Sequence, residues 1–218
     1  MPQADSSVSF ESAGFPKASM ESAIARGQGV SSSGAALESV VMEAILPPSI
    51  AVVIDCHTDS KARTLQDLRL IIKDYGGNVT PTGYLFEKKG RIVFEQDERR
   101  LGAEDVLDEA VEAGAEDVGV NGQGNIVIFT DASHTSSAAL KLATSPLRLK
   151  VQSSSIIWDP KEDTRVMIDS EKAVEALCAF VEELRENSAV QDVYMNIARG
   201  DGIAEEVWID LLDRLAIQ

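Results

Sequence analysis

The 218-residue sequence predicts an α+β fold, and three observations support this prediction. Apolar runs with the length and β-branched content of strands flank an amphipathic helix pattern before residue 90, and the same order recurs after residue 163. A separate series of strand and helix patterns lies between the two. An interrupted β, α, β order is expected when one domain is inserted into another. We therefore expect a ferredoxin-like βαβ domain interrupted by an inserted α+β domain, with a short helix before it and another after it.

Linkers and turn-forming residues suggest where these domains begin and end. A Gly/Ser-rich stretch follows the short helix PKASMESAIARG, which begins at Pro16 and stops at Gly27. The predicted divisions are a helical segment and linker over 1–34, a discontinuous ferredoxin-like domain over 35–89 plus 162–198, an inserted domain over 90–161, and a C-terminal helical extension over 199–218.

The first half of the chain begins with two adjacent strands, ESVVMEAIL and IAVVIDC, which Pro47 and Pro48 separate. Apolar residues at helical spacing then predict a helix from Arg63 to Tyr75, with Gly76-Gly77 as its C-terminal stop. The segment NVTPTGYLFEKKGRIVFEQ predicts two strands around a KKG turn, with Gly90 at the crossing between domains.

The inserted domain is predicted to be a compact βαβαβ unit. A helix runs through GAEDVLDEAVEAGAEDV, and the turn-forming pair Asn121-Gly122 precedes the strand NIVIFT. A second helix over about 134–144 and a strand over about 148–157 complete the unit.

The strand RVMID, a strongly amphipathic helix and the strand VQDVYMNI return the chain to the first domain. The apolar positions of that helix are Val174, Leu177, Cys178, Val181 and Leu184. Residues 203–215 predict a last amphipathic helix, which carries Ile203, Val207, Leu211, Leu212 and Leu215 on one face.

Composition narrows the possible functions. The two cysteines are far apart, so neither a disulfide framework nor a metal-binding cluster is expected. No apolar run approaches the roughly 20 residues that a membrane-spanning helix needs, so membrane insertion is not expected. A net charge of −16 repels polyanions, so nucleic-acid binding requires local clustering of the basic residues.

Catalysis, metal binding and cofactor binding are not predicted, and no small-molecule substrate is expected. The chain has two histidines: His57 is expected at the end of a strand, with its neighbour Cys56 on the opposite face, and His134 at the start of a helix. The glycines of GVNGQGN lack the Lys-Ser/Thr pair of a phosphate-binding loop, so a turn is favoured. The many carboxylates of AEDVLDEAVEAGAED are interpreted as a solvated helix face.

One segment departs from the acidic character of the chain. Residues 61–100 carry nine basic and six acidic side chains. Such a cluster could face phosphate groups, and it could equally be ordinary surface charge. The candidate nucleic-acid or ribosome contacts form what we call the basic island: Lys61, Arg63, Arg69, Lys73, Lys88, Lys89 and Arg91.

Five segments, in this order, resemble the YebC family, which in eukaryotes includes the translational activator of cytochrome c oxidase subunit I. They are FPKASMESAIARGQG, VVIDCHTDSKART, KDYGGNVTPTGYLFEKKG, AGAEDV and VQDVYMNI. In the second segment, Ser60 and Ala62 replace the two asparagines of the family's TDN-x-NRT motif. The positions that match family motifs are Thr58, Asp59, Thr64, Gly76, Gly77, Thr82 and Gly83.

The resemblance implies a helical first domain, of which residues 1–34 would be a remnant, followed by a ferredoxin-like domain with an α+β insertion. It also implies a non-enzymatic regulator of gene expression, most simply a translational activator that contacts RNA or the ribosome. A DNA-binding transcriptional regulator and an acidic protein-interaction module are the alternatives, with DNA the less favoured nucleic acid. The eukaryotic relatives imply a mitochondrial location, and a bacterial-type cytoplasmic location is the alternative.

Overall fold

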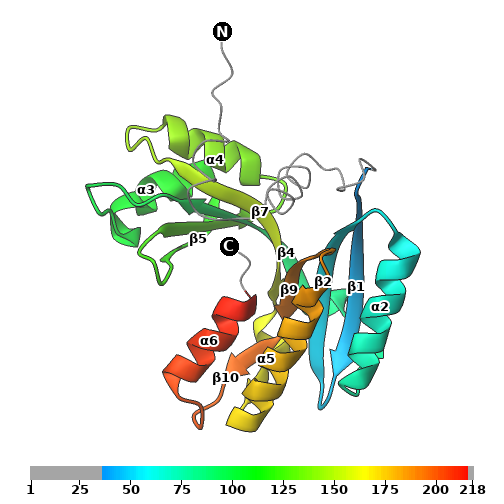
Figure 1. The fold of residues 1–218 in the computed structure, drawn as a ribbon. Coiled ribbons are helices and arrows are strands. Elements are labelled where there is room, and N and C mark those ends of the chain that lie inside the picture. The colour runs from blue at the N-terminus through cyan, green and yellow to red at the C-terminus, as the bar shows by residue number, and fades with distance from the viewer. Residues whose placement is uncertain (1–35, 216–218) are drawn as a thin grey trace, which may run out of the picture. The chain divides into compact units, whose positions relative to one another are not determined.

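The computed structural model describes residues 36–215, which separate into two compact units (Figure 1). The helix expected at residues 16–27 lies outside the described residues. The first unit contains described residues 36–81, 168–193 and 199–215, and the second contains 82–167 and 194–198. The fold is α+β, with the first unit interrupted in sequence by the second, as predicted.

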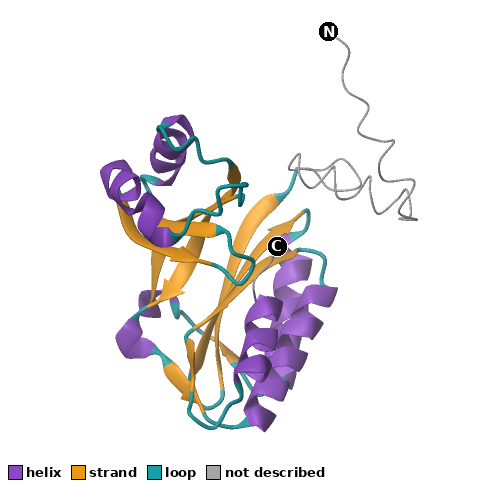
Figure 2. Ribbon diagram, turned by 90° about the vertical axis from the view of Figure 1, so that its left-hand side faces the viewer, coloured by secondary structure: helices purple, strands orange, loops and turns teal. Residues whose placement is uncertain are grey.

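A four-stranded sheet with the order β3-β1-β2-β9 organises the first unit. Its strands are β1 (Glu38–Leu46), β2 (Ile50–Thr58), β3 (Asn78–Val79) and β9 (Val190–Met195). The helices of this unit are α2 (Lys61–Asp74), α5 (Glu171–Glu186) and α6 (Glu205–Leu215). Helices α2 and α5 contact each other beside the sheet, and α6 packs against α5 (Figures 1 and 2).

Apolar side chains on one face of the sheet hold the β1–β2 hairpin together. Its antiparallel register pairs the buried residues Val40, Met42, Ala44 and Leu46 with Cys56, Ile54, Val52 and Ile50. All eight therefore lie on one face of the sheet, since side chains alternate between faces along a strand. Leu68 and Ile72 of α2, which are also buried, provide apolar surface from that helix.

The second unit has a sheet with the order β5-β6-β4-β7. Its strands are β4 (Phe86–Phe94), β5 (Ala115–Val120), β6 (Ile126–Asp131) and β7 (Val151–Pro160). Helices α3 (Ala103–Ala113) and α4 (Thr135–Thr144) enclose a core with this sheet. Large core residues are Ile92, Phe94, Val106, Ile128 and Leu142.

Short elements connect the two units in sequence. The 3-10 turns are η2 (Gly83–Leu85) and η3 (Glu162–Thr164). Strands β8 (Val166–Ile168) and β10 (Ile197–Arg199) form a two-stranded sheet. None of the helices within residues 36–215 has the length and apolar content needed to span a lipid bilayer.

The turn predicted at KKG is absent, because β4 continues through these residues as the central strand of its sheet. Gly90 pairs with Thr130 of β6 on one side and Ile156 of β7 on the other. The preceding segment contributes only the short β3 and η2. The domain division predicted between residues 89 and 90 thus falls inside a strand.

The helices α5 and α6 lie where they were predicted, but the structure adds a buried residue on α5 and assigns α6 to the first unit. In α5, Val174, Leu177, Val181 and Leu184 are buried as expected, and so is Phe180, which the predicted apolar set did not include. Residues 199–215, predicted as part of a separate extension, group with the first unit. On α6, Leu211 is buried against that unit, whereas Leu212 is 43% exposed.

The two cysteines should differ in reactivity. Both are free thiols, but Cys56 is buried in β2. Its burial, and to a smaller extent the negative charge of Asp55, raises the pKa of this thiol to about 12. Cys178 of α5 is only partly buried, and burial raises its pKa as well. Because the thiolate is the reactive form, we expect a thiol-specific reagent at pH 8 to modify Cys178 well before Cys56 in the folded protein. Mass spectrometry of labelled peptides would measure this, and equal labelling rates would contradict the packing of β2.

Candidate nucleic-acid interface

The junction between β2 and α2 is held together by two threonines of the TDSKART segment. The hydroxyls of Thr58 and Thr64 lie 2.8 Å apart, and both side chains are buried. The backbone N–H of Ser60 also donates to the Thr58 hydroxyl at 3.0 Å. A buried hydroxyl needs a hydrogen-bond partner, and here each threonine provides one for the other. The pair therefore fixes the first turn of α2 to the end of the strand.

The first turn of α2 leaves its amides without a side-chain cap. Ser60 occupies the N-cap position, and its hydroxyl makes no capping hydrogen bond. Asp59 instead binds Arg63, with Oδ1 and Nη2 3.2 Å apart. Free amides and the helix dipole make such an end favourable for anions.

Three basic residues follow this end along α2. Lys61, Arg69 and Lys73 are exposed, and within residues 36–215 they form no ion pair. Arg69 and Lys73 are four residues apart, so they are neighbours on the helix surface. We call these three residues the α2 cations.

The members of the basic island on β4 have different surroundings. Lys88 lies over the ring of Trp158, with Nζ 4.5 Å from the ring centroid. Lys89 donates to Asp159 at 2.7 Å, and this hydrogen bond raises the pKa of the lysine. Arg91, also on this strand, is partly buried. The island is therefore divided between α2 in the first unit and β4 in the second, and two of its β4 members already bind partners on β7.

The glycines of the family motif position the other end of α2. Gly76 has φ +73°, a conformation that glycine adopts at little cost, and its amide donates to Lys73 O at 2.9 Å. At Gly77 a Cβ would stand only 2.7 Å from Leu46 Cδ2 and 2.9 Å from Ile45 O. The chain thus turns back tightly against β1. Of the remaining motif positions, Thr82 is buried and Gly83 begins η2.

The histidines lie where the sequence predicted. His57 is exposed beside the buried Cys56 on β2, and His134 occupies the N-cap position of α4. Asp131 accepts hydrogen bonds from the backbone and hydroxyl of Ser133, which lower the pKa of this carboxyl. In the described part of the chain, no three His, Cys, Asp or Glu side chains are grouped to hold a metal ion.

The segment GVNGQGN forms the turn of a hairpin between β5 and β6. Asn121 Oδ1 accepts from the amides of Gln123 and Asn125 at 3.0 and 2.9 Å. Since the turn connects two antiparallel strands, it lacks the strand-to-helix context of a phosphate-binding loop.

The partner of Lys88 could not be found from local sequence. Trp158 lies opposite Lys88 in the β4–β7 register, although 70 residues separate them in the chain. The pair could have been identified only by predicting the register of β4 and β7 from the alternation of their apolar and polar residues.

The chain is similar in sequence to known proteins. Residues 37–197 match a family model described as the second and third domain of TACO1/YebC. A probable transcriptional regulatory protein of Magnetococcus marinus is 32% identical over 194 residues, covering 88% of this chain and 74% of that protein. Another from Syntrophus aciditrophicus is 35% identical over 197 residues, covering 88% and 75%.

A solved structure shows the same fold. The crystal structure of a conserved hypothetical protein from Aquifex aeolicus aligns with a TM-score of 0.67 and 29% sequence identity. The alignment covers 90% of this chain and 79% of that one.

Proposed function

The chain belongs to the TACO1/YebC family, and from this premise we propose that it is a non-enzymatic translational regulator that contacts RNA or the ribosome through α2. The observation that carries the proposal is the combination, on one helix, of an uncapped N-terminus and the α2 cations. Free amides at a helix end and basic side chains along the same helix suit a phosphate backbone.

Only a small part of the protein surface is expected to contact RNA. With a net charge of −16, the chain as a whole repels RNA, so contact must be short-range and confined to few phosphates. The threonine pair that fixes the first turn of α2 supports this role, because it holds the helix end while Ser60 makes no capping hydrogen bond to the first amides of the helix.

DNA is the second candidate, because the bacterial relatives are named probable transcriptional regulatory proteins. Duplex DNA carries one negative charge per about 1.7 Å of helix axis, which is a poor match for three cations, without ion pairs among residues 36–215, on a strongly acidic chain. We therefore favour RNA. The bacterial origin of these relatives favours the cytoplasmic alternative over a mitochondrial location.

Reversing the α2 cations should release the protein from ribosomes. In the Lys61→Glu, Arg69→Glu, Lys73→Glu variant we expect co-sedimentation at about 100 mM salt to fall at least tenfold, because three phosphate contacts become repulsive. The matched control reverses three exposed basic residues on α4 and α5: Lys141→Glu, Lys172→Glu and Arg185→Glu. It has the same net charge and should retain binding.

Three results would count against the proposal. Wild-type protein that does not sediment with ribosomes and binds no RNA would remove the function. Equal losses in both triple variants would show that only net charge matters, and retention by the α2 variant would remove α2 as the contact.

A further inference from the structure

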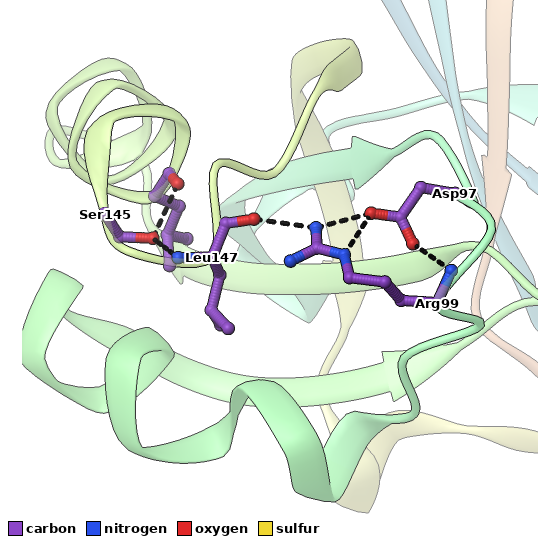
Figure 3. A network of polar contacts seen from close by, with 5 residues as sticks. Asp97, Arg99, Ser145 and Leu147 are labelled. Atoms are coloured by element: carbon purple, nitrogen blue, oxygen red, sulfur yellow. Dashed lines mark hydrogen bonds and ion pairs between the residues drawn. The ribbon is translucent and has the colours of Figure 1, made fainter.

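Two loops of the second unit are joined by an arginine that the basic island did not include. One loop follows β4 and contains Arg99, and the other precedes β7 and contains Leu147. Arg99 Nη2 donates to the Leu147 carbonyl at 2.7 Å, while Nε donates to Asp97 at 2.6 Å (Figure 3). The guanidinium thus connects two segments that are 48 residues apart in sequence.

Further hydrogen bonds hold each loop in shape. The Ser145 hydroxyl donates to Leu142 O at 2.9 Å and accepts from the Leu147 amide at 3.2 Å. The Glu95 amide donates to Lys150 O at 2.8 Å, and the side chains of these two residues form an ion pair at 2.6 Å. The loops therefore have a defined arrangement within the second unit.

Each loop also carries an exposed arginine next to the connecting hydrogen bond. Arg100 follows Arg99, and Arg148 follows Leu147. Whereas Arg99 and Lys150 are neutralised by carboxylates, Arg100 and Arg148 form no ion pair within residues 36–215. The described part of the chain thus holds, on neighbouring loops, two cations without an ion pair.

Their backbone conformation makes these arginines unusual. Arg100 has φ 51° and Arg148 has φ 47°. Both values lie in the left-handed region of backbone conformation, which residues other than glycine rarely adopt. Both are exposed, so apolar packing does not explain why arginine stands where glycine would be easier. Strained residues of this kind are often retained at binding sites.

We propose that Arg100 and Arg148 form a second phosphate-binding point, which grips the backbone of single-stranded RNA. This inference rests on the proposed function and adds a contact in the second unit to the one on α2. The small cavity beside the loops is not this site. Its wall includes Glu95, which forms an ion pair with Lys150, and Asp97, whose pKa is lowered by the hydrogen bond from Arg99, so both carboxylates already have basic partners.

The conformation allows a test that does not rely on weakening the fold. In the Arg100→Gly, Arg148→Gly variant the cations are lost while the left-handed backbone becomes easier to adopt, so the thermal midpoint should be unchanged or higher. The Arg100→Lys, Arg148→Lys variant keeps both charges and is the matched control. Affinity for a labelled oligouridine of about 16 nucleotides, the upper end of the site sizes of single-strand-binding OB folds, would be measured by fluorescence anisotropy across a salt series.

We expect the glycine variant to bind about tenfold more weakly at 100 mM salt. The slope of log affinity against log salt should become less steep by about 1.4, since each single-strand phosphate contact contributes about 0.7. The lysine variant should behave like wild type. Oligothymidine of equal length, run in parallel, shows whether the grip requires ribose or only phosphate.

An unchanged slope in the glycine variant, with binding still weakened by reversal of the α2 cations, would overturn this inference and leave the proposed function standing. Equal losses in the glycine and lysine variants would also overturn it, because altered loop geometry rather than charge would then be responsible. If wild-type protein binds no RNA, the inference and the proposed function fail together.

Discussion

Gly90→Ala should destabilise the second unit by about 3 kcal/mol, the upper end of the usual cost of overpacking a core, because the added methyl group has no space. Gly90 lies in the central strand β4, and a Cβ there would overlap the hydroxyls of Thr135 and Thr130. These hydroxyls are buried and contact each other at 3.3 Å. Threonine side chains are short, so the added methyl group must displace strand or helix backbone.

The measurement can be confined to one unit, because the chain has two tryptophans and the structure places one in each. Denaturant unfolding followed by Trp158 fluorescence, in a Trp208→Phe background, reports on the second unit. The control is Gly119→Ala on β5, where no atom lies within 4 Å of an added Cβ. It should leave stability unchanged or slightly higher. Similar unfolding midpoints for the two alanine variants would contradict the packing of β4 against α4.

Phe180→Ala should cost the first unit about 3–5 kcal/mol, the usual range for deleting a buried phenylalanine. Phe180 is completely buried on α5 and packs edge-to-face with Tyr75, their ring centroids 5.2 Å apart. Tyr75 is the C-cap residue of α2. The substitution therefore leaves a cavity. It also removes the contact that holds the C-terminal end of α2.

Trp208 fluorescence in a Trp158→Phe background would follow this unit. Leu70→Ala is the matched control, since Leu70 is on α2 and is 60% exposed. Its truncation removes little buried surface and should change stability by less than about 1 kcal/mol. If both substitutions lowered the unfolding midpoint equally, Phe180 would not be the core residue of this unit.

Local patterns were enough to predict most of the elements. The strong amphipathic period of residues 171–186 and the apolar, β-branched runs of β1 and β2 produced correct elements, because burial follows directly from those patterns. Gly90 was misinterpreted as part of a turn because its role depends on Thr130 and Thr135, which are 40 or more residues away. Sequence alone does not show that side chains from other elements occupy the space beside a glycine.

The candidate site was predictable in part. The TDSKART segment and the α2 cations could be located from charge and motif, and the structure shows how the two threonines support the helix. Counting charges along the sequence could not show whether the basic island is a single surface, because its residues belong to two different units. Arg100 and Arg148 were overlooked since their conformation and neighbouring loops exist only in three dimensions.

The relation between affinity and salt tests most directly whether this acidic chain contacts nucleic-acid phosphate through α2. Binding of the full chain to labelled oligouridine would be measured from about 50 to 200 mM salt, for wild type and for the variant with all three α2 cations reversed. We predict a linear fall in log affinity for wild type and a slope less steep by about 2 in the variant, which corresponds to three lost contacts. A wild-type protein that fails to bind at 50 mM salt, or a slope that is the same for both proteins, would contradict it.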